Sequence, residues 1–449
     1  MTSQSITQLA SGLKAKLTGR TGTLGVIGMG YVGLPLAVAA HRAGFNVLGF
    51  DVDPAKVTNI NSGKSPIRSV AAEKVAGMVA SGRFRVTADY AEIEKVDAVM
   101  ICVPTPLTEH RDPDLSFIEE TGRSIARYLR AGQLVVLEST TYPGTTQDVL
   151  RPILETGGLK TNSDYFLAYS PEREDPGNAN FETASIPRIV GADDETAAEL
   201  AVALYSQIVS NVMLVSSAAT AEAVKLTENI FRSVNIALVN ELKIIYARMG
   251  INVWEVIEGA KTKPFGFMAF YPGPGLGGHC IPIDPFYLSW KAREYDVATR
   301  FIELAGEVNA MAPQYVIDAL IEALSRRSRK SLNGSRILIA GLAYKKNVDD
   351  LRESPSLRII ELLEARGAEV EFYDPFIPVI PMTREHAALA GRRSIDWNRQ
   401  NLTRFDAVMI TTDHDEVSYQ EMVDWSQLVV DTRNATAAVA GGRDKIVLA

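Results

Sequence analysis

The sequence predicts an α/β protein with two parallel-sheet domains joined by a long central helix. Short apolar segments alternate with helical patterns along most of the 449 residues, as in parallel sheets covered by helices. Several apolar segments of the N-terminal part recur in the same order in the C-terminal part, and residues 221–249 between them contain no glycine or proline. We therefore expect three domains, over residues 1–215, 216–325 and 326–449.

The repeated segments are weak individually, because apolar strands resemble one another. Their shared order is more informative, and it predicts that the two sheet domains have similar folds. The four pairs are Leu24–Gly28 with Ile337–Gly341, Gly49–Pro54 with Glu371–Pro375, Asp97–Ile101 with the identical Asp406–Ile410, and Gln133–Val136 with Gln427–Val430.

Composition narrows the class of protein. Hydrophobic residues make up 46% of the chain, which is enough for several ordinary cores. The net charge of −8 argues against a nucleic-acid partner, which would require a basic surface. The two cysteines, Cys102 and Cys280, cannot form a disulfide framework, and no zinc spacing is present. With no long apolar run, we expect a cytoplasmic protein without a bound metal or a membrane partner.

The N-terminal domain contains a dinucleotide fingerprint. Gly28-x-Gly30-x-x-Gly33 follows the apolar strand 24–27 and opens a helix over residues 31–43. In this context the glycines allow a tight turn, close approach of a pyrophosphate and packing of helix on strand, which defines a Rossmann-like domain. Asp51, 18 residues after Gly33, ends the next strand, and its carboxylate would repel a 2′-phosphate, so NAD is favoured over NADP.

Polar residues follow two further strands of this domain. Thr140 comes after the apolar residues 134–137, and Glu172 comes after residues 165–169. The carboxyl ends of parallel strands are the usual place for sites in open α/β sheets. Either residue alone would be an ordinary surface residue. The prediction that both belong to a site therefore rests on their positions after strands.

The central stretch over residues 221–249 has apolar residues on most faces, which indicates a largely buried helix. Lys225 and Asn229 lie one turn apart on one face of it. Such a pair is often a solvated polar stripe, but on a buried helix a lysine needs a partner or a cleft.

The most unusual segment is the loop from Gly273 to Asp284, which contains four glycines besides prolines and holds Cys280. A single cysteine is most often a small buried hydrophobic residue, as the strand residue Cys102 is expected to be. Cys280 instead lies among glycines and prolines whose pattern predicts neither helix nor strand, where its thiolate could attack a carbonyl.

The repeat in the last domain, residues 341–346, has lost the glycine pattern, so we expect no second NAD there. Lys345 and Arg352 flank the acidic pair Asp349 and Asp350. These charges form either a surface ion-pair cluster or a site for a different anionic ligand.

Taken together, these segments resemble the UDP-glucose/GDP-mannose dehydrogenase family almost from end to end. Within that family the chain is most similar to bacterial enzymes that oxidise UDP-N-acetylglucosamine at C6. The matching motifs are Gly28–Gly33, Val103–Pro106, Glu138–Thr140, Ser170–Glu172, Glu222–Asn229, Gly277–Cys280 and Lys345–Pro355, with Thr140–Thr146, Glu172–Asn178, Phe265–Met268 and Cys280–Pro285 pointing to the acetylated sugar.

The resemblance implies a four-electron oxidation with two NAD per sugar through a cysteine thiohemiacetal and a thioester. The catalytic residues it implies are Cys280 as nucleophile, Lys225 as the cation beside it, Asp284 as base, Asn229 on the C6 oxygen, and Glu172 with Thr140 on the water. It assigns the cofactor to Gly28, Met29, Gly30, Tyr31, Val32, Gly33, Asp51, Val103, Thr105, Thr140 and Arg352. It assigns the UDP-sugar to Glu172, Lys225, Asn229, Tyr271, Gly277 and Lys345, and beyond the resemblance we add Arg173.

The family further implies a homodimer or larger homo-oligomer built on the central helix, and a product that enters surface polysaccharide. Arg173 stands where enzymes acting on UDP-glucose tend to have an apolar residue, so we expect it to help select the sugar. UDP-glucose 6-dehydrogenase is the alternative assignment. A two-electron β-hydroxyacid dehydrogenase would not need Cys280, and an NAD-sensing regulator would not need the catalytic set.

Overall fold

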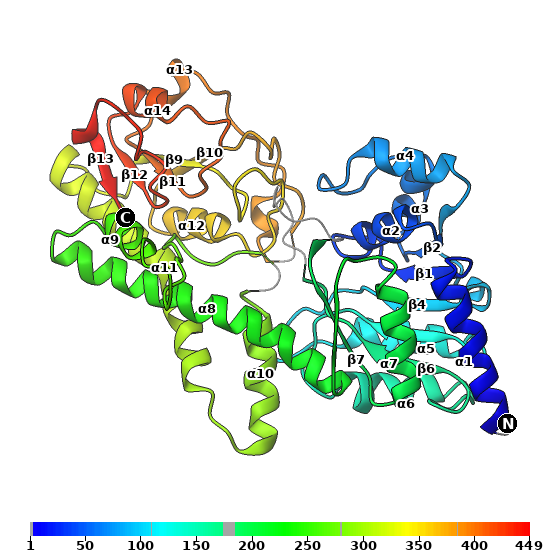
Figure 1. The fold of residues 1–449 in the computed structure, drawn as a ribbon. Coiled ribbons are helices and arrows are strands. Elements are labelled where there is room, and N and C mark those ends of the chain that lie inside the picture. Colours follow the sequence, from blue (N-terminus) through cyan, green and yellow to red (C-terminus); the bar gives the residue numbers. More distant parts are fainter. Residues whose placement is uncertain (1–2, 109, 174–184, 279–280, 384) are drawn as a thin grey trace. The chain divides into compact units, whose positions relative to one another are not determined.

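The computed structural model describes residues 3–108, 110–173, 185–278, 281–383 and 385–449 (Figure 1). The chain divides into two compact units, which are described separately. Unit 1 comprises residues 1–228 and 286–298, and unit 2 comprises residues 229–285 and 299–449. This division into two units does not test the three domain boundaries predicted from the sequence, which stay a prediction. No helix in the described ranges is long and apolar enough to span a membrane.

Unit 1 is built on a doubly wound sheet with the strand order β3-β2-β1-β4-β5-β6-β7-β8. All neighbouring strands are parallel except β6 and β7. Because β1 lies between β2 and β4, the chain reverses its winding direction at the end of β1, where ligands bind in such sheets. The strands are β1 Thr23–Ile27, β2 Asn46–Phe50, β3 Phe84–Thr87, β4 Ala98–Ile101, β5 Leu134–Leu137, β6 Phe166–Tyr169, β7 Arg188–Gly191 and β8 Val212–Val215.

Two helices of unit 1, α3 and α7, begin at aspartate caps. Asp53 accepts the Ala55 N–H at 2.8 Å to start α3, and Asp194 accepts the Ala197 N–H at 2.9 Å to start α7. The predicted N-terminal helix, α1, packs on α7. The helices of unit 1 are α1 Ser3–Thr18, α2 Gly33–Arg42, α3 Pro54–Asn61, α4 Ala72–Ala80, α5 Ser116–Ala126, α6 Arg151–Glu155 and α7 Glu195–Tyr205, with a 3₁₀ segment η1 Tyr90–Lys95 and a π-helical segment η2 Thr145–Leu150.

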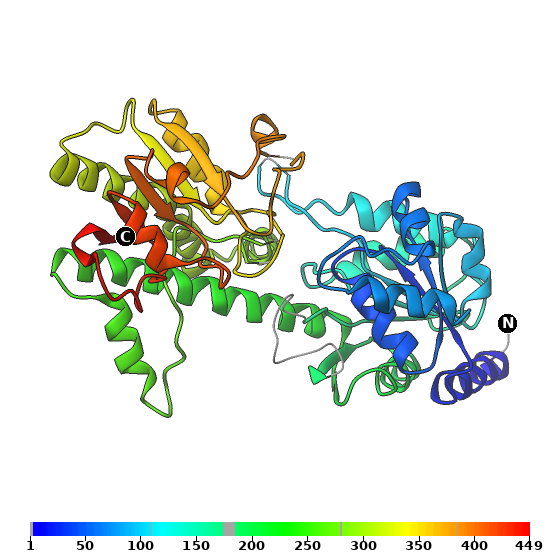
Figure 2. The same ribbon diagram turned by 90° about the horizontal axis from the view of Figure 1, so that it is seen from above.

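Unit 2 contains a smaller, wholly parallel sheet with the order β10-β9-β11-β12-β13 (Figure 2). Its strands are β9 Arg336–Ala340, β10 Glu369–Tyr373, β11 Ala407–Ile410, β12 Val429–Asp431 and β13 Ile446–Leu448. Helices α9 Val253–Lys261, α11 Arg300–Ala323, α12 Pro355–Glu364, α13 Arg399–Leu402 and α14 Tyr419–Trp425 belong to this unit, with the short segments η5 Leu324–Ser328, η6 Ala387–Leu389 and η7 Arg443–Lys445. Two helices pass from one unit to the other: the long α8 Ala218–Arg248 and α10 Asp284–Ala292, which is followed by η4 Arg293–Tyr295.

The internal repeat in the sequence is confirmed by matching strand connections. Gly28 follows β1, and its N–H donates to Phe50 O at 2.8 Å; Gly341 follows β9, and its N–H donates to Tyr373 O at 2.8 Å. Both glycines have left-handed φ angles, 93° and 89°. The fold class predicted from the sequence, two Rossmann-like sheets and a long central helix, is therefore confirmed.

The identical pentapeptides make the same contacts in both sheets. Asp97 and Asp406, their first residues, each accept the N–H of the first residue of the neighbouring strand, at 2.9 Å in β1 and 3.0 Å in β9. Each carboxylate also pairs with a lysine that precedes that strand, Lys16 at 2.8 Å in the first sheet and Lys330 in the second. The repeat therefore extends beyond apolar strands to specific polar contacts.

Candidate active site

The glycine turn between β1 and α2 has three different steric requirements. A Cβ on Gly28 would lie 2.4 Å from Cys102 O, and a Cβ on Gly33 would lie 1.9 Å from Gly28 O. Both glycines are therefore required by the fold itself. A Cβ on Gly30 would meet nothing within 4 Å, so this position is open on the protein side. An open glycine at the second position is what close approach of a pyrophosphate requires.

The other residues of this turn are Met29, Tyr31 and Val32, and they lie between Gly28 and the start of α2. Met29 is buried, Tyr31 and Val32 are half-buried, and Val32 forms the N-terminal cap of the helix without a side-chain hydrogen bond. The first-turn amides of α2 thus have no side-chain cap at Val32, as a helix that receives a phosphate group requires.

Asp51 ends β2 beside this turn. Its carboxylate accepts the Met29 N–H at 2.9 Å and the Asp53 N–H at 3.0 Å, and it pairs with Lys56 Nζ at 2.8 Å. Oδ2 takes two of these contacts and Oδ1 takes one, so Oδ1 can still accept a ribose hydroxyl. Lys56 was not predicted from the sequence to belong to this site. Its position in the first turn of the helix after Asp51 is the signal that could have indicated it.

The loops after β4 and β5 are tied together beside the same edge of the sheet. Ser139 Oγ donates to Val103 O at 2.8 Å. Thr105 is buried and Thr140 is half-buried in these loops. The structure thus places Val103, Thr105 and Thr140 at the carboxyl edge of the sheet that also carries the glycine turn.

Glu222 fastens α8 to the loop that follows Thr140. It is fully buried, and its carboxylate accepts the Gly144 N–H at 2.6 Å, the Thr146 N–H at 2.9 Å and the Thr146 hydroxyl at 2.6 Å. Burial raises the pKa of Glu222 to about 7, against the effect of these donors. Lys225 lies one turn further along α8 and is also buried. Glu222 therefore fixes the part of the helix that positions Lys225.

A buried ionic cluster holds the predicted residue Glu172. Arg188 Nη1 pairs with Glu172 Oε2 at 3.0 Å, and Arg188 Nη2 pairs with Glu138. The Tyr205 hydroxyl donates to the other oxygen of Glu138, and Arg188 Nε donates to Ser170 Oγ at 3.0 Å. Burial raises the pKa of Glu138 to about 7. One guanidinium therefore pairs with two carboxylates, and the Arg188 contact fixes the position of the Glu172 side chain.

Arg173 makes contacts that the sequence did not indicate. Its Nη2 pairs with Glu228 Oε1 on α8 at 2.6 Å, and its Nη1 donates to Pro187 O at 2.6 Å. Its backbone N–H donates to Glu172 Oε1 at 2.6 Å. Arg173 thus lies beside Glu172, but much of its hydrogen-bonding capacity is used within unit 1.

In unit 2 the structure brings two predicted catalytic residues into contact. Asn229 Nδ2 donates to Asp284 Oδ2 at 2.5 Å, and both side chains are buried. Asp284 is the first residue of α10, four positions after Cys280. Cys280 itself lies outside the described residues, as does His279.

The described part of the glycine-rich loop is anchored at both ends. Asn240 Oδ1 accepts the Gly273 N–H at 3.0 Å, and Lys243 Nζ donates to Gly273 O at 3.3 Å. The Gly278 N–H donates to Arg352 O at 2.9 Å. A Cβ on Gly277 would lie 2.5 Å from the Cβ of Tyr344, so no larger residue fits there. The backbone entering the cysteine segment is therefore held by α8 on one side and by residues 344–352 on the other.

Lys243 is the most unusual of these anchors, because it is buried and has no acidic partner in the described part of unit 2. Its ammonium lies 5.0 Å from the Tyr315 ring centroid. Burial, with a smaller contribution from Arg433, lowers the pKa of Lys243 from its ordinary 10.5 to about 7. The native state therefore binds fewer protons than the unfolded state between these two pH values.

Substituting Lys243→Met is accordingly expected to stabilise the protein by on the order of 2 kcal/mol at pH 6.5. The gain should shrink toward pH 10, because the parent protein itself becomes more stable as pH rises through this window. Urea unfolding of both proteins at pH 6.5, 8 and 9.5 measures this difference. A gain that stays constant with pH would contradict a depressed pKa.

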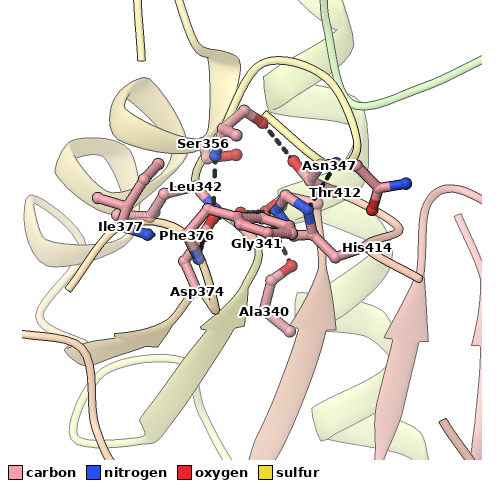
Figure 3. Close-up of polar contacts among 12 residues, drawn as sticks. Ala340, Gly341, Leu342, Asn347, Ser356, Asp374, Phe376, Ile377, Thr412 and His414 are labelled. Atoms are coloured by element: carbon pink, nitrogen blue, oxygen red, sulfur yellow. Dashed lines mark hydrogen bonds and ion pairs between the residues drawn. The ribbon is translucent and has the colours of Figure 1, made fainter. Parts of the chain in front are cut away.

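The second sheet retains the shape of the dinucleotide turn but fills it (Figure 3). Asp374 occupies the position of Asp51, and it accepts the Leu342 N–H at 2.6 Å and the Phe376 N–H at 2.8 Å. Its remaining space is taken by His414, whose Nε2 lies 3.1 Å from Asp374 Oδ2. Both oxygens of Asp374 already have at least two donors, whereas Asp51 Oδ1 has one, so Asp374 cannot receive a ribose as Asp51 can.

The remaining predicted residues lie in unit 2 but make different contacts. Lys345 is half-buried in the loop after β9. Arg352 forms a two-pronged ion pair with Asp350, the shortest contact being 2.7 Å. The Tyr271 hydroxyl donates to Glu258 Oε1 at 2.5 Å and accepts from Lys261 at 3.3 Å, and its ring stacks on Trp254. No group of acidic, histidine or cysteine side chains able to hold a metal occurs among the described residues.

An open glycine turn and a buried aspartate at the reversal point of a doubly wound sheet define a dinucleotide-binding α/β protein. Three family models match in succession: the NAD-binding domain of the UDP-glucose/GDP-mannose dehydrogenase family at residues 22–209, its central domain at 219–311 and its UDP-binding domain at 338–438. The chain belongs to the UDP-glucose/GDP-mannose dehydrogenase family.

Similar proteins agree with this assignment. The UDP-N-acetyl-D-mannosamine dehydrogenase of Pyrococcus horikoshii is 36% identical over 420 residues, which cover 92% of this chain and 95% of that protein. The UDP-N-acetyl-D-glucosamine 6-dehydrogenase of Pseudomonas aeruginosa is 37% identical over 354 residues, covering 78% and 82%. The solved structure of the Pyrococcus horikoshii enzyme matches with a TM-score of 0.82 at 34% identity, over 92% of this chain and 96% of that one. The chain is thus an NAD-dependent UDP-sugar dehydrogenase.

Proposed function

We propose that this enzyme oxidises UDP-N-acetylglucosamine at C6 to the uronic acid, through a thiohemiacetal and a thioester on Cys280. The observation that carries the proposal is the buried contact between Asn229 and Asp284, four residues from Cys280. A buried amide and carboxylate in hydrogen-bond contact are suited to orienting an alcohol and removing its proton. The similar enzymes named above act on N-acetylated hexosamines, which supports the acetylated sugar.

The residues divide the reaction among them. NAD, when bound, accepts a hydride from C6 in each of two rounds. Asp284 takes the hydroxyl proton in the first round, and the resulting aldehyde is attacked by the Cys280 thiolate. The Lys225 ammonium favours the thiolate and stabilises the oxyanion at C6. After the second oxidation, water held by Glu172 and Thr140 hydrolyses the thioester and restores the thiol. The balance is one alcohol, two NAD⁺ and one water giving a carboxylate, two NADH and three protons.

Binding of the two nucleotides follows the two sheets. In this proposal the glycine turn and Asp51 receive NAD, with Val103, Thr105, Thr140 and Arg352 as further contacts. Lys345, Gly277 and Tyr271 receive the UDP-sugar. The open Gly30 supports the first assignment, and the filled aspartate position in the second sheet supports a different nucleotide there.

The first experiment counts NADH per sugar with excess NAD and limiting UDP-N-acetylglucosamine, UDP-N-acetylmannosamine or UDP-glucose. About two NADH per UDP-N-acetylglucosamine, with loss of net acid formation in Cys280→Ala, is expected for the thioester route. One NADH per sugar with an unaffected Cys280→Ala variant would refute the cysteine mechanism. Preference for UDP-glucose would move the assignment to UDP-glucose 6-dehydrogenase.

The same assay tests the proposed role of Arg173 in selecting the sugar. Arg173→Phe removes both the side chain and its ion pair with Glu228, so Glu228→Gln is the matched control that breaks the pair alone. We expect Arg173→Phe to lower the preference for the acetylated sugar about tenfold or more. If both variants keep the parental ratio of kcat/KM between the UDP-sugars, Arg173 does not select the substrate.

We also propose that the enzyme is a homodimer or larger homo-oligomer assembled on α8. Three apolar side chains of α8, spaced seven residues apart, are exposed in the single chain: Phe231, Leu238 and Ile245. A regularly spaced exposed apolar stripe on a long helix is typical of a helix–helix interface. We expect Leu238→Glu to lower the molar mass found by light scattering, whereas Val52→Glu, at an exposed apolar site in unit 1, should not. An unchanged mass for Leu238→Glu would place the interface elsewhere.

A further inference from the structure

His414, in the loop after β11, is held by hydrogen bonds at both of its ring nitrogens. Its Nδ1 lies 2.9 Å from the backbone nitrogen of Asn347, and its Nε2 lies 3.1 Å from Asp374 Oδ2 (Figure 3). A backbone N–H can only donate, so Nδ1 must be the acceptor and Nε2 must carry the proton. The fully buried ring therefore accepts from Asn347 and donates to Asp374.

These two contacts connect both ends of the loop that contains Lys345. Asp374 accepts the N–H groups of Leu342 and Ala343, at 2.6 and 3.1 Å, where the loop leaves β9. Asn347, two residues after Lys345, has a left-handed φ of 62° and is fixed by the imidazole. The ring thus links the start of the loop to its far side.

A second, exposed set of contacts fastens the same stretch. Asn347 Nδ2 donates to Asp415 Oδ2 at 2.6 Å, Asn347 Oδ1 accepts the Asp415 N–H at 3.0 Å, and Lys346 Nζ pairs with Asp415 Oδ1 at 3.0 Å. Residues 346 and 347 are therefore bound to the turn that carries His414 by both buried and surface interactions. Lys345 directly precedes this bound pair, so its position depends on it.

We propose that His414 is a positioning residue for UDP-sugar binding, acting through the Asn347 amide to place Lys345. This inference rests on the proposed role of Lys345. A ring that only filled space would not need an acceptor aimed at a loop amide and a donor aimed at a buried carboxylate. Its loss should therefore weaken binding of the uridine nucleotide more than it affects NAD or the chemical step.

The test compares two substitutions in the full-length enzyme. His414→Phe keeps a ring against Phe376, whose centroid lies 5.0 Å away, but removes both polar contacts. His414→Gln keeps one donor and one acceptor. Titration calorimetry with UDP and with NAD measures the two affinities, and steady-state assays separate KM from kcat. We expect His414→Phe to weaken UDP about tenfold and to raise KM for the UDP-sugar, with NAD affinity and kcat changed less than about threefold. His414→Gln should recover most of the UDP affinity.

Two further variants show whether a loss of UDP affinity in His414→Phe comes from the loop or from a general failure to fold. Asp415→Ala removes the two exposed contacts of the Asp415 carboxylate and keeps its backbone N–H, and we expect a threefold or so loss of UDP affinity, since the buried contacts remain. His386→Phe, which removes a half-buried histidine paired with Glu361 in the same unit, should leave UDP affinity unchanged. Unchanged UDP affinity in His414→Phe, or an equal loss of UDP and NAD affinity, would overturn the inference. A parental enzyme that binds no UDP would instead refute the proposed substrate site.

Discussion

Replacing Arg188 with methionine is expected to lower the free energy of unfolding by about 3–5 kcal/mol. Arg188 pairs with two buried carboxylates, Glu138 and Glu172, and methionine would take this positive charge away from both. Removing one partner of a buried ion pair costs far more than the pair contributes, because the remaining charge stays buried. Urea unfolding followed by circular dichroism measures this loss.

The pH dependence distinguishes this cause from simple loss of packing. Burial already raises the pKa of Glu138 to about 7, and without Arg188 it should rise further, so the folded state holds more protons than the unfolded one above about pH 4.5. The deficit of Arg188→Met should then be larger at pH 8 than at pH 5. Arg123→Met, which breaks the exposed pair with Glu119, is the control and should cost less than about 1 kcal/mol. Equal costs for the two variants would contradict the role of burial.

The second large effect is expected when alanine replaces glycines of the dinucleotide turn. Gly33→Ala would put a Cβ 1.9 Å from Gly28 O, so the helix must move away from the strand. We expect this variant to lose about 1–3 kcal/mol of stability and all measurable NAD affinity. Gly30→Ala meets no protein atom within 4 Å, so its stability should be unchanged.

Gly30→Ala should nevertheless weaken NAD about 100-fold, because its methyl group would occupy the approach of the pyrophosphate. Thermal unfolding and NAD titration of the two variants separate these effects. The pair is a sharp test because the substitutions are chemically identical and only three residues apart. If Gly30→Ala bound NAD as tightly as the parent protein, the turn would not be the pyrophosphate site.

The sequence was sufficient for the fold and for the parts of the site that depend on local pattern. The glycine turn, Asp51 and the long helix are encoded in spacing within one segment, and the repeated strands encode the second sheet. The four-residue step from Lys225 to Asn229 and the position of Asp284 also follow from local order.

The residues that sequence reasoning missed make contacts between distant segments. Glu138 and Tyr205 are 67 residues apart, and the Asn347–His414 contact also spans 67 residues. No periodicity or motif indicates such a pair, because either residue alone suits many environments. Arg173 shows the same limit: its neighbour Glu172 was anticipated, but its ion pair with Glu228 crosses 55 residues and arises only in the folded chain.

The matching polar contacts of the two sheets have a consequence for the history of this chain. Similar apolar strands can arise by convergent evolution. The matching lysine–aspartate ion pairs, and the aspartates at the same turn, are instead what duplication and fusion of one ancestral gene segment would leave. After such an event one copy kept a turn that is open at Gly30, while the other acquired His414 against Asp374. An ancestor with one kind of nucleotide pocket would thereby have become an enzyme with two different nucleotide-binding sheets, one for NAD and one for the UDP-sugar.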